Sequence, residues 1–330
     1  MGIRYRVWTA IAITVGLALG IVACRQEGDD RESKAYPVRV VTTVGMIADA
    51  VREVAGEHAE VVGLIGSGVD PHLYRPTRDD VARLQQADII FYNGFMLEGR
   101  MADALTRIAA LGKPAYALAE HLDEDYLLEP PDAKGEVDPH VWMDVRGWME
   151  MVGVIAEKLA SFDPERADDY RSRAEQYLEE LAKLDAYVED VIGSIPDDQR
   201  ILITAHDAFH YFERAYGIEV RGVQGVSTES EAGLREINEL VDLIAARQVR
   251  AVFSETSVAE KSVQALVEAA RSRGHQVAIG PSLYSDAMGP ANTYEGTYIG
   301  MIDHNATAIA RALGGEAPAG GMKGQLRGQR

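Results

Sequence analysis

Pro164-Glu-Arg-Ala-Asp-Asp-Tyr-Arg-Ser-Arg-Ala-Glu-Gln-Tyr-Leu-Glu-Glu-Leu-Ala-Lys-Leu-Asp-Ala-Tyr-Val-Glu-Asp-Val-Ile192 has the pattern of one long helix. A proline stands near its first turn, where proline is tolerated. At 1.5 Å per residue the helix would be roughly 40 Å long. The stretch predicts a rigid linker beside two domains, and an ordinary long core helix is the alternative. Its apolar positions follow the helical period: Tyr170, Ala174, Tyr177, Leu178, Leu181, Leu184, Val188 and Val191.

Strand and helix patterns alternate on both sides of this helix. Alternation of this kind is typical of parallel βαβ units, so we expect an α/β fold with two (βα) lobes and parallel sheets. The expected strands are Val38–Val44, Ala59–Ile65, Ala87–Tyr92, Pro114–Ala119, Arg200–Ala205, Glu219–Val223, Ala251–Ser254 and Gln276–Ile279. The expected helices are Met46–Ala55, Thr77–Gln86, Leu97–Leu111, Arg146–Ala160, Ala208–Tyr216, Glu231–Arg247, Glu260–Arg273 and Gly296–Leu313.

These patterns divide the chain into lobes, a linker and two peripheral segments. We expect an N-terminal lobe over residues 37–163, the linker helix over 164–193 and a C-terminal lobe over 194–313. The acidic stretch His121–Asp138 reads as a surface loop whose charges face solvent. Residues 314–330 are rich in glycine and predict a disordered tail.

The N-terminus has the layout of a secretory signal. Two arginines precede an apolar run that ends in Ile21-Val22-Ala23-Cys24, after which the chain becomes abruptly charged. Cys24 is the only cysteine and stands where a bacterial lipoprotein carries its lipid. We therefore expect a signal peptide over residues 1–23, lipidation of Cys24 and a tether over 24–36. An uncleaved anchor is the alternative, although the run is shorter than the ~20 residues that span a bilayer.

The chain is strongly acidic. It has 33 Lys and Arg against 52 Asp and Glu, a formal net charge of −19. Acidity of this degree makes nucleic acid an unsuitable partner and a cation a more natural one. From the signal sequence and Cys24, we expect the rest of the protein to lie outside the cytoplasm, in the cell envelope. We expect a lipid-anchored monomer without disulfides, because no second cysteine is present to pair with Cys24.

The tetrapeptide Val-Asp-Pro-His occurs twice, ending at His72 and His140. Proline fixes its own φ and restricts the residue before it, so each copy places an imidazole on a stiff turn. Further donors are available at His206 in Thr204-Ala-His-Asp-Ala-Phe and at Asp286 in Leu283-Tyr-Ser-Asp. Three imidazoles and one carboxylate are a suitable metal shell.

The expected fold brings these residues toward one region. In open parallel sheets ligands bind beyond the carboxyl ends of the strands, and His72, His206 and Asp286 follow strand ends. Two donors come from each half of the chain, so a metal held by all four would lie in the cleft between the lobes.

His206-Asp-Ala-Phe-His210 gives a second interpretation. Its spacing resembles the His-Glu-x-x-His motif of zinc proteases, with Asp207 in place of the glutamate. That motif belongs inside a helix, whereas His206 ends an expected strand, and aspartate is shorter than the usual base. A metallohydrolase that uses His206 and His210 would have Asp207 or Glu255 as its base.

The sequence resembles the zinc/manganese/iron substrate-binding lipoproteins of bacterial ABC importers, also called cluster A-I, over nearly all of residues 37–313. The resemblance implies two (βα) lobes joined by one long helix, and metal ligands at His72, His140, His206 and Asp286. His210 stands where glycine is frequent in the family, so no role is transferred to it. The matching segments are Gly68–Thr77, Tyr92–Gly94, Val137–Asp144, Ala205–Phe209, Ala215–Gly217, Gln224–Thr228, Leu283–Asp286 and Gly296–Met301.

The resemblance implies capture of one divalent ion and its delivery to an ABC permease driven by a cytoplasmic ATPase. Three imidazoles and a carboxylate suit Zn²⁺ well, and Mn²⁺ or Fe²⁺ acceptably. Four protein ligands leave little room for the open position of a catalytic zinc, so we do not expect an enzyme. An envelope metallohydrolase and a metal-binding adhesin lipoprotein remain the alternatives.

Overall fold

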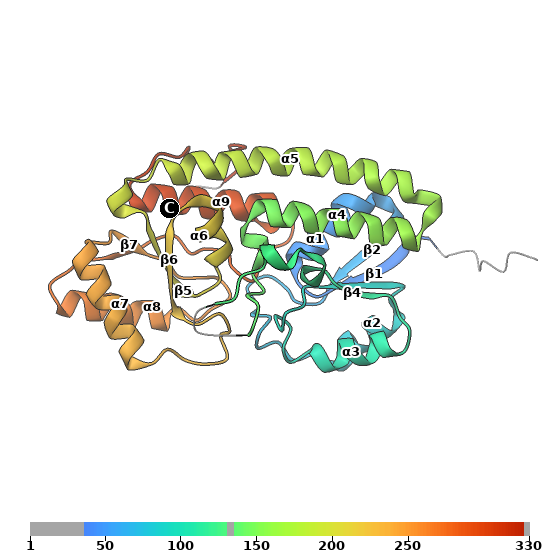
Figure 1. Ribbon diagram of the computed structural model, residues 1–330, viewed down its shortest axis with the longest axis horizontal. Coiled ribbons are helices and arrows are strands. Elements are labelled where there is room, and N and C mark those ends of the chain that lie inside the picture. The colour runs from blue at the N-terminus through green and yellow to red at the C-terminus, as the bar shows by residue number, and fades with distance from the viewer. Residues whose placement is uncertain (1–35, 131–134, 327–330) are drawn as a thin grey trace, which may run out of the picture. The chain divides into compact units, whose positions relative to one another are not determined.

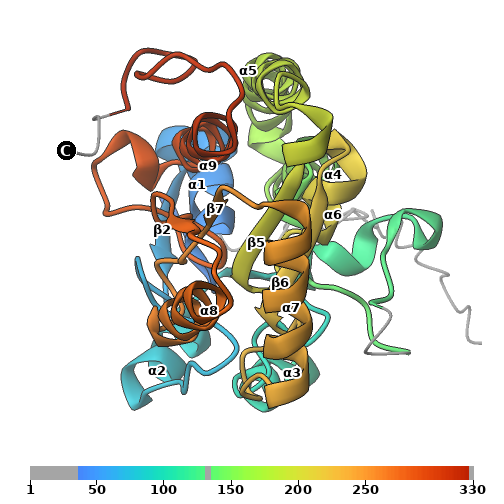
Figure 2. The same ribbon diagram turned by 90° about the vertical axis from the view of Figure 1, so that its left-hand side faces the viewer.

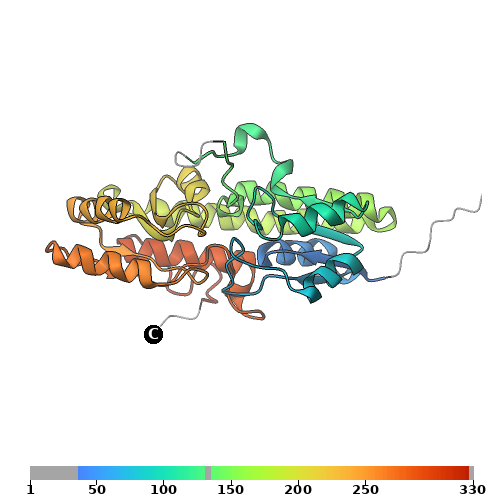
Figure 3. The ribbon, with the colours of Figure 1, turned by 90° about the horizontal axis from the view of Figure 1, so that it is seen from below.

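The computed structural model describes residues 36–130 and 135–326, and both the expected signal peptide and Cys24 lie outside these ranges. Within them, strands and helices alternate in two halves at opposite ends of one long helix, α5 (Ala167–Gly193) (Figure 1). Seen from below, the blue-to-green first half and the yellow-to-orange second half lie side by side (Figure 3). The α/β architecture with two lobes, predicted from the alternation, is confirmed.

The first half contains a four-stranded parallel sheet in the order β2-β1-β3-β4. Thr77 caps α2, and its hydroxyl and the Asp80 carboxylate form a reciprocal capping box. The helix expected from Leu97 begins only at Ala102, because the chain first forms consecutive turns over residues 95–101, which start with left-handed Phe95 and Met96. The elements are β1 (Val38–Thr42), α1 (Gly45–Ala55), β2 (Ala59–Gly63), α2 (Arg78–Gln86), β3 (Ile89–Tyr92), α3 (Ala102–Ala110) and β4 (Ala115–Ala117).

The second half contains two parallel strand pairs, β5-β6 and β7-β8. A hydrogen bond of 2.8 Å from the Phe253 amide to the Ile203 carbonyl links the two pairs. The parallel strands direct their carboxyl ends toward the junction with the first half. The elements are β5 (Ile201–His206), α6 (His210–Tyr216), β6 (Glu219–Gln224), α7 (Leu234–Arg247), β7 (Ala251–Val252), α8 (Lys261–Ser272) and β8 (Ala278–Ile279).

Three helices form a layer over one side of both halves: α4 (Val145–Phe162), α5 and α9 (Tyr298–Leu313). Figure 2 shows this layer above the strands, with α2, α3, α7 and α8 on the other side. One continuous hydrophobic core runs from the first sheet through these helices to α6, and a smaller core lies under α7 and α8. Helix α5 therefore joins the halves and is also packed into their shared core. No helix in the described ranges is long and apolar enough to cross a bilayer.

The expected disorder after Leu313 does not hold for residues 314–326. The Glu316 amide donates to the Ser194 hydroxyl at 2.8 Å, and Lys323 pairs with Glu180 of α5 at 2.8 Å. The Met322 amide donates to the buried carboxylate of Asp303 on α9. A glycine-rich composition predicted disorder, but these contacts attach the segment to α5 and α9.

Candidate metal centre

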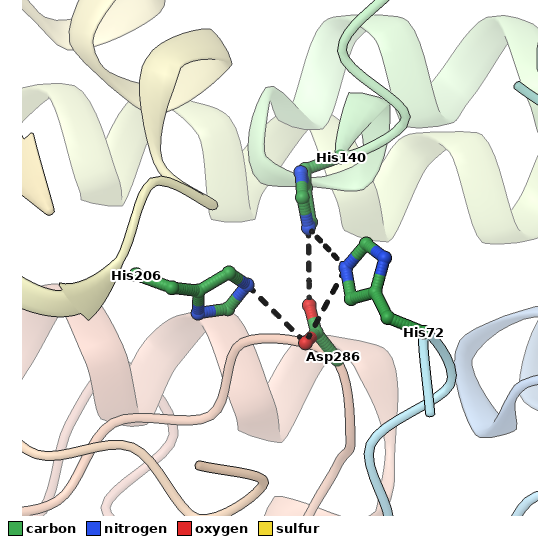
Figure 4. A group of neighbouring side chains, drawn as sticks. All are labelled: His72, His140, His206 and Asp286. Atoms are coloured by element: carbon green, nitrogen blue, oxygen red, sulfur yellow. Dashed lines mark hydrogen bonds and ion pairs between the residues drawn. The ribbon is translucent and has the colours of Figure 1, made fainter. Parts of the chain in front are cut away.

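His72, His140, His206 and Asp286 converge at the junction of the two halves (Figure 4). One donor atom from each residue lies within 4.8 Å of all the others. The Nε2 atoms of His72 and His140 are 3.4 Å apart, and His140 Nε2 lies 3.2 Å from Asp286 Oδ1. Asp286 Oδ2 lies 3.3 Å from His206 Nε2 and 3.9 Å from His72 Nε2. All four side chains are buried.

The two Val-Asp-Pro-His turns are built alike. In each turn the aspartate Oδ1 accepts a hydrogen bond from the backbone amide of the histidine two residues later, at 2.8 Å in Asp70–His72 and 2.9 Å in Asp138–His140. Such a local bond, together with the intervening proline, restricts the backbone on which the imidazole stands. The repeated motif thus supplies two pre-positioned donors from the first half.

The second half supplies its two donors from neighbouring strand ends. His206 is the last residue of β5. The segment before Asp286 pairs in parallel with the chain after β7, between Leu283 and Glu255. Trp142 of the first half donates its indole N–H to the Ser285 carbonyl at 3.0 Å, which holds the Asp286 loop against the His140 turn.

Two buried carboxylates orient two of the imidazoles. Asp138 Oδ1 lies 2.7 Å from His140 Nδ1, and Glu255 Oε2 lies 2.5 Å from His206 Nδ1. An ionised carboxylate only accepts hydrogen bonds, so in both histidines Nδ1 carries the proton. In the neutral ring this leaves the Nε2 lone pair free to face the centre, as in metal sites whose histidines are held by carboxylates.

The electrostatics of the site favour a bound cation over bare side chains. Burial alone would lower the pKa of His140, but the Asp138 and Asp286 carboxylates raise it to about 9. Burial also opposes charge on His206, yet Asp286 and Glu255 raise its pKa well above the ordinary value. Burial lowers the pKa of His72 to about 3. Without a metal, His140 and His206 thus carry protons at neutral pH beside these buried carboxylates, where a bound cation would take their place.

The spacing of the donors suits a metal ion at their centre. In a tetrahedral site with bonds near 2.1 Å, neighbouring ligand atoms are about 3.4 Å apart. The four distances around Asp286 and His140 lie between 3.2 and 3.9 Å. Within the described residues, neither oxygen of Asp286 nor His206 Nε2 makes a well-aligned hydrogen bond, although all three atoms are buried. Buried polar atoms are rarely left unpaired, so their shared direction indicates a ligand.

A cavity of about 1070 Å³ opens beside the centre and reaches His72. Its wall carries more acidic than basic side chains, including Asp207, Glu136 and Glu229. An acidic wall concentrates cations near a site that is itself shielded from solvent.

The structure does not bring His206 and His210 to one point. His206 directs Nε2 toward Asp286, whereas His210 Nδ1 lies 3.0 Å from Asp138 Oδ2. Asp207 accepts the Gly222 amide, and Glu255 holds His206 through both of its oxygens. The His-x-x-x-His spacing therefore makes no protease-like pair, and the residues considered as bases have other partners.

A family described as "Zinc-uptake complex component A periplasmic" matches residues 40–312. The chain belongs to this family. It is 45% identical over 288 residues to the manganese-binding lipoprotein MntA of Bacillus subtilis, covering 87% of this chain and 94% of that one. It is 46% identical over 274 residues to the zinc-binding protein TroA of Treponema pallidum, covering 83% and 88%. The metal ABC transporter substrate-binding lipoprotein FimA of Streptococcus parasanguinis is 29% identical over 313 residues, covering 93% and 99%.

Solved structures of this family share the fold. The periplasmic zinc-binding protein TroA of T. pallidum superposes with a TM-score of 0.81 at 46% identity, covering 84% of this chain and 99% of that one. Fe(III)-bound YtgA of Chlamydia trachomatis gives a TM-score of 0.76 at 27% identity with the same coverage. In both comparisons nearly the whole solved chain is covered, so its overall fold is shared.

The carboxylates that orient the donors do not stand out in the sequence. The loop pattern of residues 121–138 predicts a solvated Asp138, but its side chain is fully buried between His140 and His210. Its place in the second Val-Asp-Pro-His motif was the signal that could have identified it. Glu255 was considered only as a hydrolytic base, and it lies 49 positions from His206 with no local motif to connect them.

Proposed function

We propose that this protein captures one divalent transition-metal ion, Zn²⁺ or Mn²⁺ with Fe²⁺ as a further candidate, and delivers it to an ABC permease. His72, His140, His206 and Asp286 would be the ligands. The observation that carries this proposal is that four buried side chains converge at the junction of two lobes. Within the described part of the chain, His206 Nε2 and both oxygens of Asp286 have no well-aligned hydrogen bond. Relatives named as manganese-binding, zinc-binding and metal ABC transporter lipoproteins support the same function.

The donor set narrows the cargo to a class of ion. Imidazole nitrogen with one carboxylate suits Zn²⁺, and Mn²⁺ or Fe²⁺ bind acceptably when the carboxylate uses both oxygens. Both oxygens of Asp286 face the centre. Zinc binds such sites more tightly than manganese on intrinsic grounds, so the transported ion is set by supply as well as by affinity.

The proposed architecture assigns each segment of the chain a task. Residues 37–163 and 194–313 form the metal-binding lobes, and residues 164–193 form the linker helix. Cys24 would carry a lipid that holds the monomeric protein on the extracytoplasmic side of a membrane, near the permease and its ATPase. Relatives named lipoproteins support this location.

We do not assign an enzymatic activity. A catalytic zinc requires a coordination position for water or substrate, and four protein ligands around one ion leave none in a tetrahedral site. Unchanged function after loss of the metal ligands would instead favour a structural or adhesin role.

Calorimetric titration with zinc and manganese tests the proposed site. Wild-type protein should bind one ion, and His206→Ala and Asp286→Ala should each weaken binding sharply, because each removes one of the second half's two donors. His121→Ala, an exposed histidine outside the centre, is the matched control. A stoichiometry of two, or wild-type affinity in both ligand variants, contradicts the assignment. Elemental analysis of protein from its native envelope identifies the cargo.

Metabolic labelling with a radioactive fatty acid tests the anchor. Wild-type protein should incorporate label and sediment with membranes, because several acyl chains anchor stably where a single chain is marginal. Cys24→Ala should lose both properties. Continued labelling and membrane attachment of that variant would refute the lipid anchor.

A further inference from the structure

His210 lies outside the four-donor centre but is connected to it through one residue. Its Nδ1 is 3.0 Å from Asp138 Oδ2, while the other oxygen of Asp138 accepts both the ring and the backbone amide of His140. Asp138 is fully buried and bridges the two imidazoles. The chain of contacts thus runs from α6 of the second half to a proposed ligand of the first half.

Tyr211, the residue after His210, binds the backbone of Asp138. Tyr211 donates its hydroxyl to the Asp138 carbonyl at 3.0 Å, and it is itself buried. Two successive residues of α6 therefore fix the backbone and the carboxylate of Asp138. Tyr211 also accepts the Leu128 amide at 3.1 Å, which makes it part of the general packing of this loop. His210 is partly exposed at the cavity wall, and its other ring nitrogen, Nε2, lies 3.8 Å from Asp207 Oδ1, beyond hydrogen-bond distance.

Removal of the His210 donor would have a defined consequence. Asp138 Oδ2 would become a buried acceptor without a donor, which is costly even though Oδ1 keeps its two bonds to His140. Rotation of the carboxylate toward another donor would move Oδ1, which alone holds the His140 ring by its Nδ1. The Nε2 atom of His140 would then leave its position 3.2 Å from Asp286.

We infer that His210 is a positioning residue for metal capture, which holds Asp138 so that His140 presents Nε2 to the ion. This inference rests on the proposed metal-binding function. His210 donates from Nδ1 whether its ring is neutral or charged, so the role follows from geometry. Carboxylates and their supports around metal-bound histidines typically contribute 10- to 100-fold to metal affinity, roughly the effect expected here.

Two substitutions separate the hydrogen bond from the volume of the side chain. His210→Leu removes the donor and keeps much of the bulk, whereas the amide nitrogen of His210→Asn can take the place of Nδ1. Zinc affinity, measured by competition with a chelator, should fall about 10- to 100-fold in His210→Leu. It should recover most of that loss in His210→Asn. His121→Leu, on the exposed side of the first half, should bind zinc as the wild type does.

A double-mutant cycle tests whether His210 acts through Asp138. His210→Leu should weaken zinc binding in the wild type but have little further effect in an Asp138→Ala background, because the intermediate residue is then absent. Equal losses of zinc affinity in both backgrounds overturn the inference. Wild-type zinc affinity in His210→Leu also overturns it, as does equally weak zinc binding by His210→Leu and His210→Asn. Melting curves of the metal-free variants show that each one folds.

The outcomes also separate this inference from the proposed function. Wild-type protein that binds no divalent ion refutes the proposed function. Wild-type protein that binds one zinc ion, with His206→Ala weakened and His210→Leu unchanged, retains the metal site and refutes only the role of His210.

Discussion

Glu255 accepts two hydrogen bonds from His206, one from the backbone amide at 2.8 Å and one from ring Nδ1 at 2.5 Å. Both residues are fully buried, and Glu255 comes from the segment that also pairs with the Asp286 loop. Glu255 therefore directs an imidazole through its carboxylate, and through its backbone it pairs with the segment that leads to Asp286.

Glu255→Gln should weaken zinc binding about 10- to 100-fold, with a small effect on the fold. The glutamine oxygen can still accept one hydrogen bond, but its amide N–H₂ cannot accept the proton on His206 Nδ1. The ring then loses its fixed direction. Chelator competition measures the change, and Glu268→Gln on the exposed face of α8 serves as the control. Equal affinity in the two variants would show that Glu255 does not orient His206.

The carboxylates of the two Val-Asp-Pro-His turns differ in their second partner. Asp138 Oδ2 contacts the imidazole of His210, whereas Asp70 Oδ2 accepts a hydrogen bond from the Thr228 hydroxyl at 2.5 Å. Thr228 belongs to the second half, and the next residue, Glu229, pairs with Arg100 of the first half at 3.2 Å. The segment after β6 is therefore attached to the first half beside His72.

Thr228→Val should accelerate zinc release about 3- to 10-fold, since it removes one hydrogen bond worth roughly 1 kcal/mol between the halves. The substitution keeps the shape of the side chain. Thr228→Ser keeps the hydroxyl and should release zinc at nearly the wild-type rate. Stopped-flow transfer of the ion to a fluorescent chelator gives both rates. A valine variant as slow as the serine variant would mean that this contact does not restrain release.

Zinc affinity should increase with pH between pH 6 and pH 9. Without metal, nearby carboxylates raise the pKa of His140 to about 9 and that of His206 well above its ordinary value. Both rings must lose a proton before Nε2 can bind, so each ion displaces about two protons near neutral pH. Affinity should then change by up to about a hundredfold per pH unit below pH 7. The sign follows because protonation stabilises only the metal-free state.

Chelator competition between pH 6 and pH 9 measures this dependence. Calorimetry in buffers with different heats of ionisation counts the released protons independently. His121→Leu should follow the wild-type profile, since its ring faces solvent outside the centre. A flat profile would be inconsistent with a shell of three imidazoles.

Three of the four proposed ligands could be located from sequence because each stands in a local signal. His72 and His140 follow Asp-Pro turns, and His206 directly follows a β-branched strand pattern. Their convergence required only the rule that parallel strands bring their carboxyl ends together. The fold was predictable for a related reason, since hydrophobic period and alternation are also local properties.

The supporting contacts were not predictable because they depend on tertiary packing. Asp138 meets His210 across 72 positions, and Thr228 meets Asp70 across 158. Composition misled the prediction for residues 314–326, since glycine and scattered charge suggest disorder. The contact that orders this segment is with the buried carboxylate of Asp303 on α9, and the sequence does not indicate that this side chain is buried.

Asp303 holds the segment that follows α9. Its carboxylate is fully buried and accepts from the Met322 amide, the Tyr294 hydroxyl and the Thr307 hydroxyl. Gly321, with φ +73°, lets the backbone approach so closely that a Cβ there would overlap this carboxylate. The segment lies beyond residues 40–312, the range that the family model matches.

Asp303→Ala should lower the free energy of unfolding by about 2–4 kcal/mol, because it leaves three donors without their acceptor and opens a cavity in α9. A chain that ends at residue 315 should lose less, since Asp303 keeps its two hydroxyl partners. Urea denaturation of the metal-free protein measures both changes. Asp242→Ala, which removes an exposed partner of Arg273, should change stability by less than about 1 kcal/mol. Wild-type stability in Asp303→Ala would show that the C-terminal segment is not held by this carboxylate.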